Sequence, residues 1–205
     1  MTGGIDASFL SSKCVINECL GVVLACGLSS RMGQDKAQLL RNKQSMLSML
    51  EFSKQTLSNS GISNIVVSGD NYDVPDMVKK NGPVGGILSV LSKFPQVKSL
   101  LILPVDLPFM TAKALADLRL KGELCQKATY FEGHSVPLYL PNSSYVELFL
   151  AKAFQSDSVT EKKGPSIKAL LKHIPHQEIQ SKDANILFNT NTPEQWQQAK
   201  QQLNF

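Results

Sequence analysis

Residues 21–39 read GVVLACGLSSRMGQDKAQL, and the rest of the chain is interpreted from this stretch. The apolar run at 21–25 predicts a buried strand, which breaks into a loop of small residues at 26–33. A strand that leads into a glycine-bearing loop and a helix commonly holds phosphate, because backbone N–H groups and the helix dipole face the anion. Arg31 in the loop and Lys36 at the head of the expected helix can neutralise that anion's charge.

The stretch matches neither of the two common nucleotide-binding motifs. The interval from Gly27 to Gly33 is one residue too long for a P-loop, and no G-x-G-x-x-G is present. The stretch does resemble the signature L-A-G-G-x-S-x-R-M-G-x-D-K of nucleotidyltransferases that activate sugars and pterins, most closely the MobA-type molybdenum cofactor guanylyltransferases. The matching residues are Leu24, Ala25, Cys26, Gly27, Ser29, Arg31, Met32, Gly33, Asp35 and Lys36. Cys26 departs from the signature, since a glycine is usual at that position.

Length and charge favour one domain that handles small anions. The chain of 205 residues can bury a good core, and residues 1–18 are interpreted as an extension before a domain at 19–205. The net charge of +4 comes from 21 basic and 17 acidic residues. No basic block is dense enough to favour nucleic acid as a partner.

Cysteine usage and hydropathy indicate the compartment. The four cysteines show no C-x-x-C spacing, and a chain of this size needs no disulfide, so reduced thiols are favoured. No segment reaches the roughly 18 to 20 apolar residues of a membrane helix. The N-terminus lacks the basic region of a signal peptide. We therefore expect a cytoplasmic protein with no membrane segment.

Helical and strand patterns alternate after Lys36. Apolar positions from 39 to 57 predict one amphipathic helix, which ends at Asn59-Ser60-Gly61. Residues 65–69 predict a short buried strand. Ser68 would then lie at the carboxyl edge of a parallel sheet, where open α/β folds bind ligands.

A second glycine-rich loop, NGPVGG, spans residues 81–86 ahead of a predicted helix. By itself this loop is either a plain turn or a backbone surface for a base or ribose. In the resembled family a G-P-x-x-G element lines the nucleotide pocket, which implicates Gly82 and Pro83. The resemblance also implies that Asp76 contacts the nucleoside.

Residues 99–106, SLLILPVD, have the strongest strand pattern in the chain, and their apolar run is typical of a central parallel strand. Asp106 at the end of this run would be costly to bury alone, so it caps the next helix, pairs with a cation or binds metal. The resemblance favours metal, because P-x-D-x-P matches Pro104, Asp106 and Pro108. In the family this aspartate holds Mg²⁺ on the nucleotide phosphates, which implies Mg²⁺ as the cofactor.

A helix is expected at 112–120, ended by Gly122, followed by two strands at 128–131 and 136–140 that form an antiparallel hairpin. His134 in the hairpin connection either contacts a pterin or phosphate or is an ordinary loop histidine, and we favour the second reading.

The C-terminal third carries two further candidate binding segments. The basic loop at 162–166 precedes a predicted helix and either holds a phosphate of the second substrate or is simply solvated. In FNTNTPE, Thr192 should cap a helix, while Asn189 and Asn191 alternate onto one face of an extended segment. The family carries F-x-N-x-N-T-P-E or close to it here, which implies that both asparagines reach the active site and its second substrate.

The alternation of strands and helices predicts an α/β fold: a three-layer α/β/α Rossmann-like sandwich with a mainly parallel sheet and an antiparallel hairpin. The resemblance makes this fold similar to the nucleotide-diphospho-sugar transferases.

The resemblance implies that GMP passes from GTP to the phosphate of Mo-molybdopterin, which gives molybdopterin guanine dinucleotide and pyrophosphate. Such transfer depends on positioning and charge neutralisation. The implied catalytic residues are Arg31, Lys36 and Asp106, with Asp106 on the metal. The implied nucleotide-binding residues are Leu24, Ala25, Cys26, Gly27, Lys36, Ser68, Asp76, Gly82, Pro83 and Asp106. Transient contact with molybdopterin-inserting proteins or molybdoenzymes would follow.

Two alternatives stay open. One is a molybdopterin cytidylyltransferase that uses CTP, or a related sugar or pterin nucleotidyltransferase. The other is a non-catalytic nucleotide-binding protein that docks on molybdoenzymes. Cys26 keeps the second alternative open, because a Cβ is unfavourable there if the position needs a positive φ.

Overall fold

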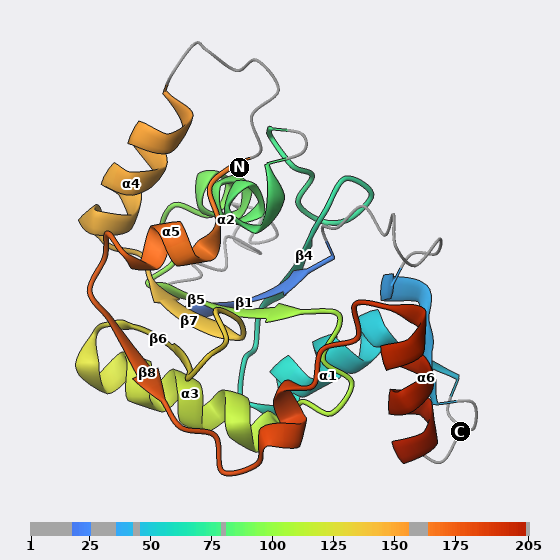
Figure 1. Cartoon of the computed structure of the whole chain (residues 1–205). Coiled ribbons are helices and arrows are strands. Elements are labelled where there is room, and N and C mark those ends of the chain that lie inside the picture. The colour runs from blue at the N-terminus through green and yellow to red at the C-terminus, as the bar shows by residue number, and fades with distance from the viewer. Residues whose placement is uncertain (1–17, 26–35, 43–45, 79–80, 156–163, 204–205) are drawn as a thin grey trace, which may run out of the picture.

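A computed structural model describes residues 18–25, 36–42, 46–78, 81–155 and 164–203 of the chain. Its middle layer is a six-stranded sheet in the order β4-β1-β5-β7-β6-β8 (Figure 1). The strands are β1 (Cys19–Leu24), β4 (Ile65–Ser68), β5 (Ser99–Pro104), β6 (Ala128–Phe131), β7 (Leu138–Pro141) and β8 (His176–Ile179).

Strand direction brings the site-bearing ends of the sheet together. β1 pairs in parallel with β4 and β5, and β6 pairs in parallel with β8. β7 pairs antiparallel with both β5 and β6, so it alone of these six strands runs the other way. The carboxyl ends of the other five therefore share one edge. The predicted mainly parallel sheet and the β6–β7 hairpin are confirmed.

Helices cover both faces of the sheet (Figure 1). α1 (Met49–Asn59) and α3 (Ala112–Cys125) lie on one face. α2 (Gly82–Lys93), α4 (Ser144–Phe154) and α5 (Ile167–Leu171) lie on the other. α6 (Pro193–Gln202) packs against α1 through Trp196 and Met49. The predicted three-layer α/β/α sandwich is confirmed.

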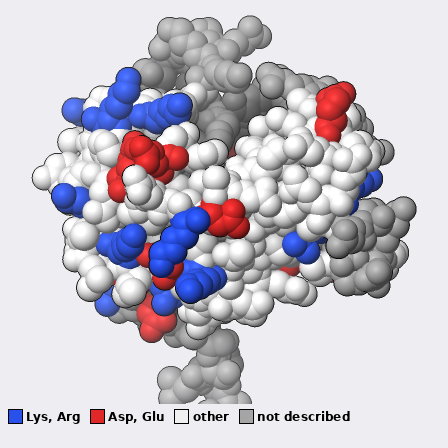
Figure 2. Space-filling model, turned by 60° about the horizontal axis from the view of Figure 1, so that its bottom comes forward, with Lys and Arg blue, Asp and Glu red and all other residues white. Residues whose placement is uncertain are grey.

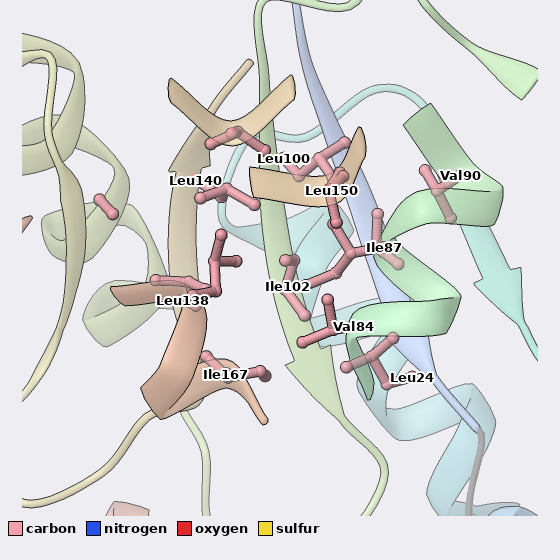
Figure 3. Packing of buried hydrophobic residues seen from close by; sticks show 14 of the residues in the cluster. Leu24, Val84, Ile87, Val90, Leu100, Ile102, Leu138, Leu140, Leu150 and Ile167 are labelled. Atoms are coloured by element: carbon pink, nitrogen blue, oxygen red, sulfur yellow. The ribbon is translucent and has the colours of Figure 1, made fainter. Parts of the chain in front are cut away.

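Alternation along the strands builds the two cores. On β5, Leu100 and Ile102 belong to the cluster under α2 and α4, whereas Leu101 and Leu103 belong to the cluster over α1 and α3. Figure 3 shows the first of these clusters, in which Leu100 and Ile102 meet Ile87 of α2. A central strand buried on both faces explains why residues 100–104 are apolar without interruption.

The predicted helix over residues 39–57 is wrong in its first half. Residues 36–42 and 46–48 instead form a 3₁₀ turn and a small ribbon, and α1 begins at Met49. The short elements are η2 (Lys36–Gln38), β2 (Leu40–Asn42) and β3 (Leu47–Ser48). Ser48 and Glu51 form a capping box, in which the Glu51 N–H donates to the Ser48 hydroxyl at 3.2 Å. This box fixes the start of the helix, as the S-x-x-E pattern at 48–51 could have indicated.

Two glycine predictions also need correction. The predicted loop at 81–86 lies largely in the first turn of α2, which starts at Gly82 with Pro83 in that turn. The predicted stop at Gly122 is an interior position of α3. A Cβ added there would lie 2.6 Å from Cγ of Tyr139, so the missing side chain lets α3 approach β7.

The surface charge is mixed. Figure 2 shows one face of the molecule, on which basic and acidic side chains are interspersed over one half and uncharged residues cover most of the other. No helix in the described ranges is long and apolar enough to span a bilayer.

Candidate active site

The site lies where β1, β4 and β5 end side by side. Leu24 at the end of β1 pairs with Ser68 of β4 and Pro104 of β5. The Ala25 N–H donates to the Ser68 carbonyl at 3.0 Å, so the chain leaves β1 held against β4. Asp106 follows Pro104 by two residues, and the first loop and the predicted metal-binding carboxylate therefore start from neighbouring strands.

Asp106 is a buried carboxylate with one unused oxygen. Its side chain is 16% exposed, and within the described ranges its Oδ1 atom has no hydrogen-bond partner. Burial raises the pKa of this carboxyl above its usual range, while the Lys36 ammonium and the Asn189 amide oppose that rise. The backbone carbonyl of Asp106 accepts two hydrogen bonds from Thr190, one from its N–H at 3.0 Å and one from the Thr190 hydroxyl at 3.1 Å. The backbone of this turn is thus tied to the C-terminal segment.

Lys36 joins three distant parts of the chain. Its Nζ atom lies 3.5 Å from Oδ2 of Asp106 and donates to Oδ1 of Asn191 at 2.7 Å. Ala37 beside it is fully buried, which anchors η2 at the edge of the core. The structure therefore brings together Lys36, Asp106 and Asn191, which were predicted from three separate motifs.

The segment 188–192, called the C-terminal strap below, crosses this edge without helix or strand structure. Asn189 faces Asp106, and its Oδ1 atom is buried without a hydrogen-bond partner in the described part of the chain. The predicted Thr192 cap is present, because the Thr192 hydroxyl accepts from the Gln195 N–H at 3.3 Å. Both asparagines thus lie at the edge predicted for them, and their contact with a second substrate stays a prediction.

Gln195 is a positioning residue that sequence reasoning missed. Its Oε1 atom accepts hydrogen bonds from the backbone N–H groups of Asn191 at 2.8 Å and Thr192 at 3.1 Å. It therefore holds the backbone of the residue that binds Lys36. The T-x-x-Q pattern of a capping box was the available signal.

Arg41 is a second missed residue, and it supports the turn that follows Asp106. Its Nε donates to the Pro108 carbonyl at 2.7 Å, and its guanidinium carbon lies 4.0 Å from the Phe52 ring centroid. Partial burial lowers the pKa of Arg41 from its usual value. No local pattern marks this role, because it depends on β2 lying beside the turn.

The elements of the second predicted loop border the same edge. Gly82 and Pro83 open α2, and Asp76 is half-buried in the β4–α2 connection. Gly164 packs closely on the residue before α2, since a Cβ there would lie 2.8 Å from Cα of Asn81. The described end of the predicted basic loop therefore adjoins the start of α2. The nucleotide contacts assigned to Ser68, Asp76, Gly82 and Pro83 stay predictions.

Several predicted residues lie outside the described residues. They are Cys26, Gly27 and Arg31 of the first loop, and Lys162 and Lys163 of the basic loop. No group of three or more His, Cys, Asp and Glu side chains in the described ranges could hold a metal. The oxygens that fit a hard cation are instead the unpartnered Oδ1 atoms of Asp106 and Asn189.

Solved structures share this fold. A molybdopterin-guanine dinucleotide biosynthesis protein A from Archaeoglobus fulgidus matches with a TM-score of 0.68 at 18% identity, over 90% of this chain and 98% of that one. The 2-C-methyl-D-erythritol 4-phosphate cytidylyltransferase of Thermus thermophilus matches with a TM-score of 0.61 at 11% identity, over 90% of this chain and 98% of that one. At these identities the likeness concerns the fold alone.

Sequence relatives are closer. The molybdenum cofactor guanylyltransferase of Xanthomonas euvesicatoria is 30% identical over 181 residues, which cover 86% of this chain and 91% of that protein. The protein of the same name from Rhizobium leguminosarum is 28% identical over 203 residues, which cover 91% and 94%. The family model of the MobA-like NTP transferase domain matches residues 21–157, from within β1 to beyond the end of α4, and this range includes both Lys36 and Asp106. The chain belongs to the MobA-like NTP transferase domain family.

Proposed function

We propose that this protein transfers GMP from GTP to the phosphate of Mo-molybdopterin, which forms molybdopterin guanine dinucleotide and releases pyrophosphate. The convergence of Lys36, Asp106 and Asn191 where parallel strands end carries the proposal. The names of the similar Xanthomonas and Rhizobium proteins support guanylyl transfer to the molybdenum cofactor.

The reaction joins two anions, so charge placement is the main task of the chain. The Lys36 ammonium would bind the phosphates of GTP. These phosphates would compete with the Asp106 carboxylate for the ammonium. Arg31 would supply a second cation from the first loop. The first loop would hold the nucleotide through backbone N–H groups from Cys26 and Gly27 onward, and Leu24 and Ala25 would border it, because the Ala25 N–H is already bound to the Ser68 carbonyl.

We propose Mg²⁺ as the cofactor, held by Asp106 with Asn189 as a second oxygen ligand. The support is the pair of buried, unpartnered Oδ1 atoms on these side chains, because Mg²⁺ prefers oxygen ligands. When bound, the ion would neutralise charge on the α-phosphate and the leaving pyrophosphate. The first turn of α2, with Gly82 and Pro83, and the residues Ser68 and Asp76 would border the nucleoside.

No general base is required in this proposal, because a terminal phosphate is already ionised near neutral pH. Asn191 would orient Lys36 and meet the incoming phosphate of the second substrate. After transfer, we propose a transient handover of the product to molybdopterin-inserting proteins or molybdoenzymes. The free thiols Cys19 and Cys125 support a reducing compartment such as the cytoplasm.

The test is pyrophosphate release with Mo-molybdopterin and each of GTP, CTP, ATP and UTP, with and without Mg²⁺. We expect release with GTP and Mg²⁺, and a strong preference over CTP, because a site that hydrogen-bonds guanine leaves polar groups unpaired with cytosine. Preference for CTP would overturn the guanylyl assignment. Tight GTP binding without release would instead indicate a non-catalytic nucleotide-binding protein.

A further inference from the structure

A hollow lies further along the site-bearing edge of the sheet, outside the Lys36–Asp106 pair. Its volume is about 330 Å³, and it is lined by Glu132, His134, Gln180, Ser181, Ala184 and Leu187. Glu132 and His134 come from the connection after β6, and Gln180 and Ser181 follow β8. Since β6 and β8 run parallel to each other, these residues leave the sheet at the same edge.

The distance from this hollow to Asp106 suits the two ends of one substrate. In the sheet order β5-β7-β6, the strand that delivers Glu132 is two places from the strand that delivers Asp106. At roughly 4.8 Å per strand this separation is about 10 Å across the sheet. A ligand with a fused ring at one end and a phosphate at the other can span such a gap.

One continuous segment connects the two places. η3 (Ala184–Leu187) contributes Ala184 and Leu187 to the hollow, and its C-cap Phe188 leads directly into the C-terminal strap. The strap then places Asn189 against Asp106 and Asn191 on Lys36. A ligand in contact with η3 therefore lies along the path that ends at the reacting phosphate.

The hollow has a fixed backbone and available polar side chains. The Glu132 N–H donates to the Ile179 carbonyl at 3.0 Å, and the His134 N–H donates to the Phe131 carbonyl at 2.9 Å. Gly133 between them has a φ of +77°, which allows this tight turn. Within the described ranges no hydrogen bond or ion pair engages the Glu132 carboxylate or the His134 ring.

We infer that this hollow binds the ring end of the second substrate and that Glu132 recognises it; the inference rests on the proposed function. The ligand class is a flat heterocycle that presents adjacent N–H and NH₂ donors, as the pterin of molybdopterin does. A carboxylate accepts two such donors at once, which makes Glu132 a selective partner. Leu187 and Ala184 supply apolar surface against the ring, and His134, Gln180 and Ser181 supply adaptable hydrogen bonds.

The test compares Glu132→Gln and Glu132→Ala with wild type in pyrophosphate release at saturating GTP, with Mo-molybdopterin varied. We expect the KM for Mo-molybdopterin to rise roughly tenfold in Glu132→Gln and further in Glu132→Ala, because a hydrogen bond to a charged acceptor is lost. The KM for GTP and the melting temperature should stay near wild type, because Glu132 is exposed. Glu147→Gln, an exposed carboxylate on α4, is the matched control and should change neither KM.

A second readout is the Kd for Mo-molybdopterin without GTP, from quenching of intrinsic fluorescence, which should weaken in parallel with KM. If both Glu132 variants keep the wild-type KM and Kd, the inference is overturned and the proposed function stands. If wild-type protein does not use Mo-molybdopterin with GTP at all, the proposed function fails and the inference fails with it.

Discussion

At the scale of single residues, Asp106 lies at the site-bearing edge of the sheet, but its buried surroundings disfavour the charged carboxylate. Burial is the largest influence on its carboxyl, and the pKa is raised although Lys36 lies 3.5 Å away. The folded chain therefore binds a proton at this carboxyl more tightly than the unfolded chain does. The resulting stabilisation is fully present below the unfolded pKa and is lost as pH rises through the folded pKa.

We therefore predict that Asp106→Asn removes part of the pH dependence of stability. Wild type should lose free energy of unfolding relative to the variant as pH rises from about 3.9, because only wild type must then ionise a carboxyl whose charge burial disfavours. Pyrophosphate release should fall roughly 100-fold or more. Urea unfolding at a series of pH values measures the first effect.

The control for this substitution is Asp117→Asn on α3, where the aspartate is exposed. It should leave both the pH profile and turnover unchanged. Parallel unfolding curves for wild type and Asp106→Asn across the acid range would show that burial does not disfavour the Asp106 charge.

At the scale of elements, the capping box of α6 determines where Asn191 lies. Gln195 accepts hydrogen bonds from two strap N–H groups, so the helix start and the active-site contact share one side chain. We predict that Gln195→Ala lowers kcat/KM several-fold and the free energy of unfolding by about 1 kcal/mol. Gln198→Ala, an exposed residue of the same helix, should change neither quantity. Loss of stability with full activity would indicate that Gln195 does not position Asn191.

The packing of α3 on β7 gives a prediction that opposes helix propensity. Alanine normally stabilises a helix relative to glycine by about 1 kcal/mol, yet a Cβ at Gly122 would overlap the buried Tyr139 ring. Gly122→Ala should therefore destabilise the protein by about 1 to 3 kcal/mol. Urea denaturation measures this, with the exposed neighbour substitution Lys121→Ala as the near-neutral control. A more stable Gly122→Ala would mean that the ring moves aside easily.

The same elements show which structure a sequence can reveal. β1, β4 and β5 were predictable because each contains a short run of apolar residues, as strands of a parallel sheet covered by helices do. The ribbon of β2 and β3 was mistaken for helix, since its sparse apolar residues fit either period. β8 has only four residues and half of them are exposed, so no pattern marked it. Gly122 lies inside α3 because the Tyr139 ring of β7 packs against it. This contact between distant parts of the chain could not be read from the local sequence.

At the scale of the whole molecule, the site is an assembly of separate chain segments. The motifs predicted Lys36, Asp106 and Asn191 one by one, and the parallel pairing of β1 with β5 explains why the first two meet. The contact of Asn191 with Lys36 was not predictable from local patterns, because it depends on the path of the strap after η3. The roles of Gln195 and Arg41 were likewise not predictable, because their side chains act by binding backbone groups of other segments.

Ligands that bind across these segments should stabilise the complete fold. We predict that GTP with Mg²⁺ at about 100 times its Kd adds roughly 2.7 kcal/mol, or about 5 to 10 °C in melting temperature for a domain of this size. CTP should give a smaller shift, and Asp106→Asn should lose the Mg²⁺-dependent part. A thermal-shift panel of the four nucleotides measures this, and equal shifts for all four would contradict guanine recognition.

The hydrogen bond from Lys36 to Asn191 joins residues that are 155 positions apart in the chain. A ribosome must therefore add 155 residues after Lys36 before the ammonium can meet its amide partner. Until the strap emerges from the exit tunnel, the growing polypeptide can complete much of the sheet but lacks the residues that orient Lys36. Nascent chains arrested before residue 191 should accordingly be silent in pyrophosphate release, because they lack the amide that orients Lys36.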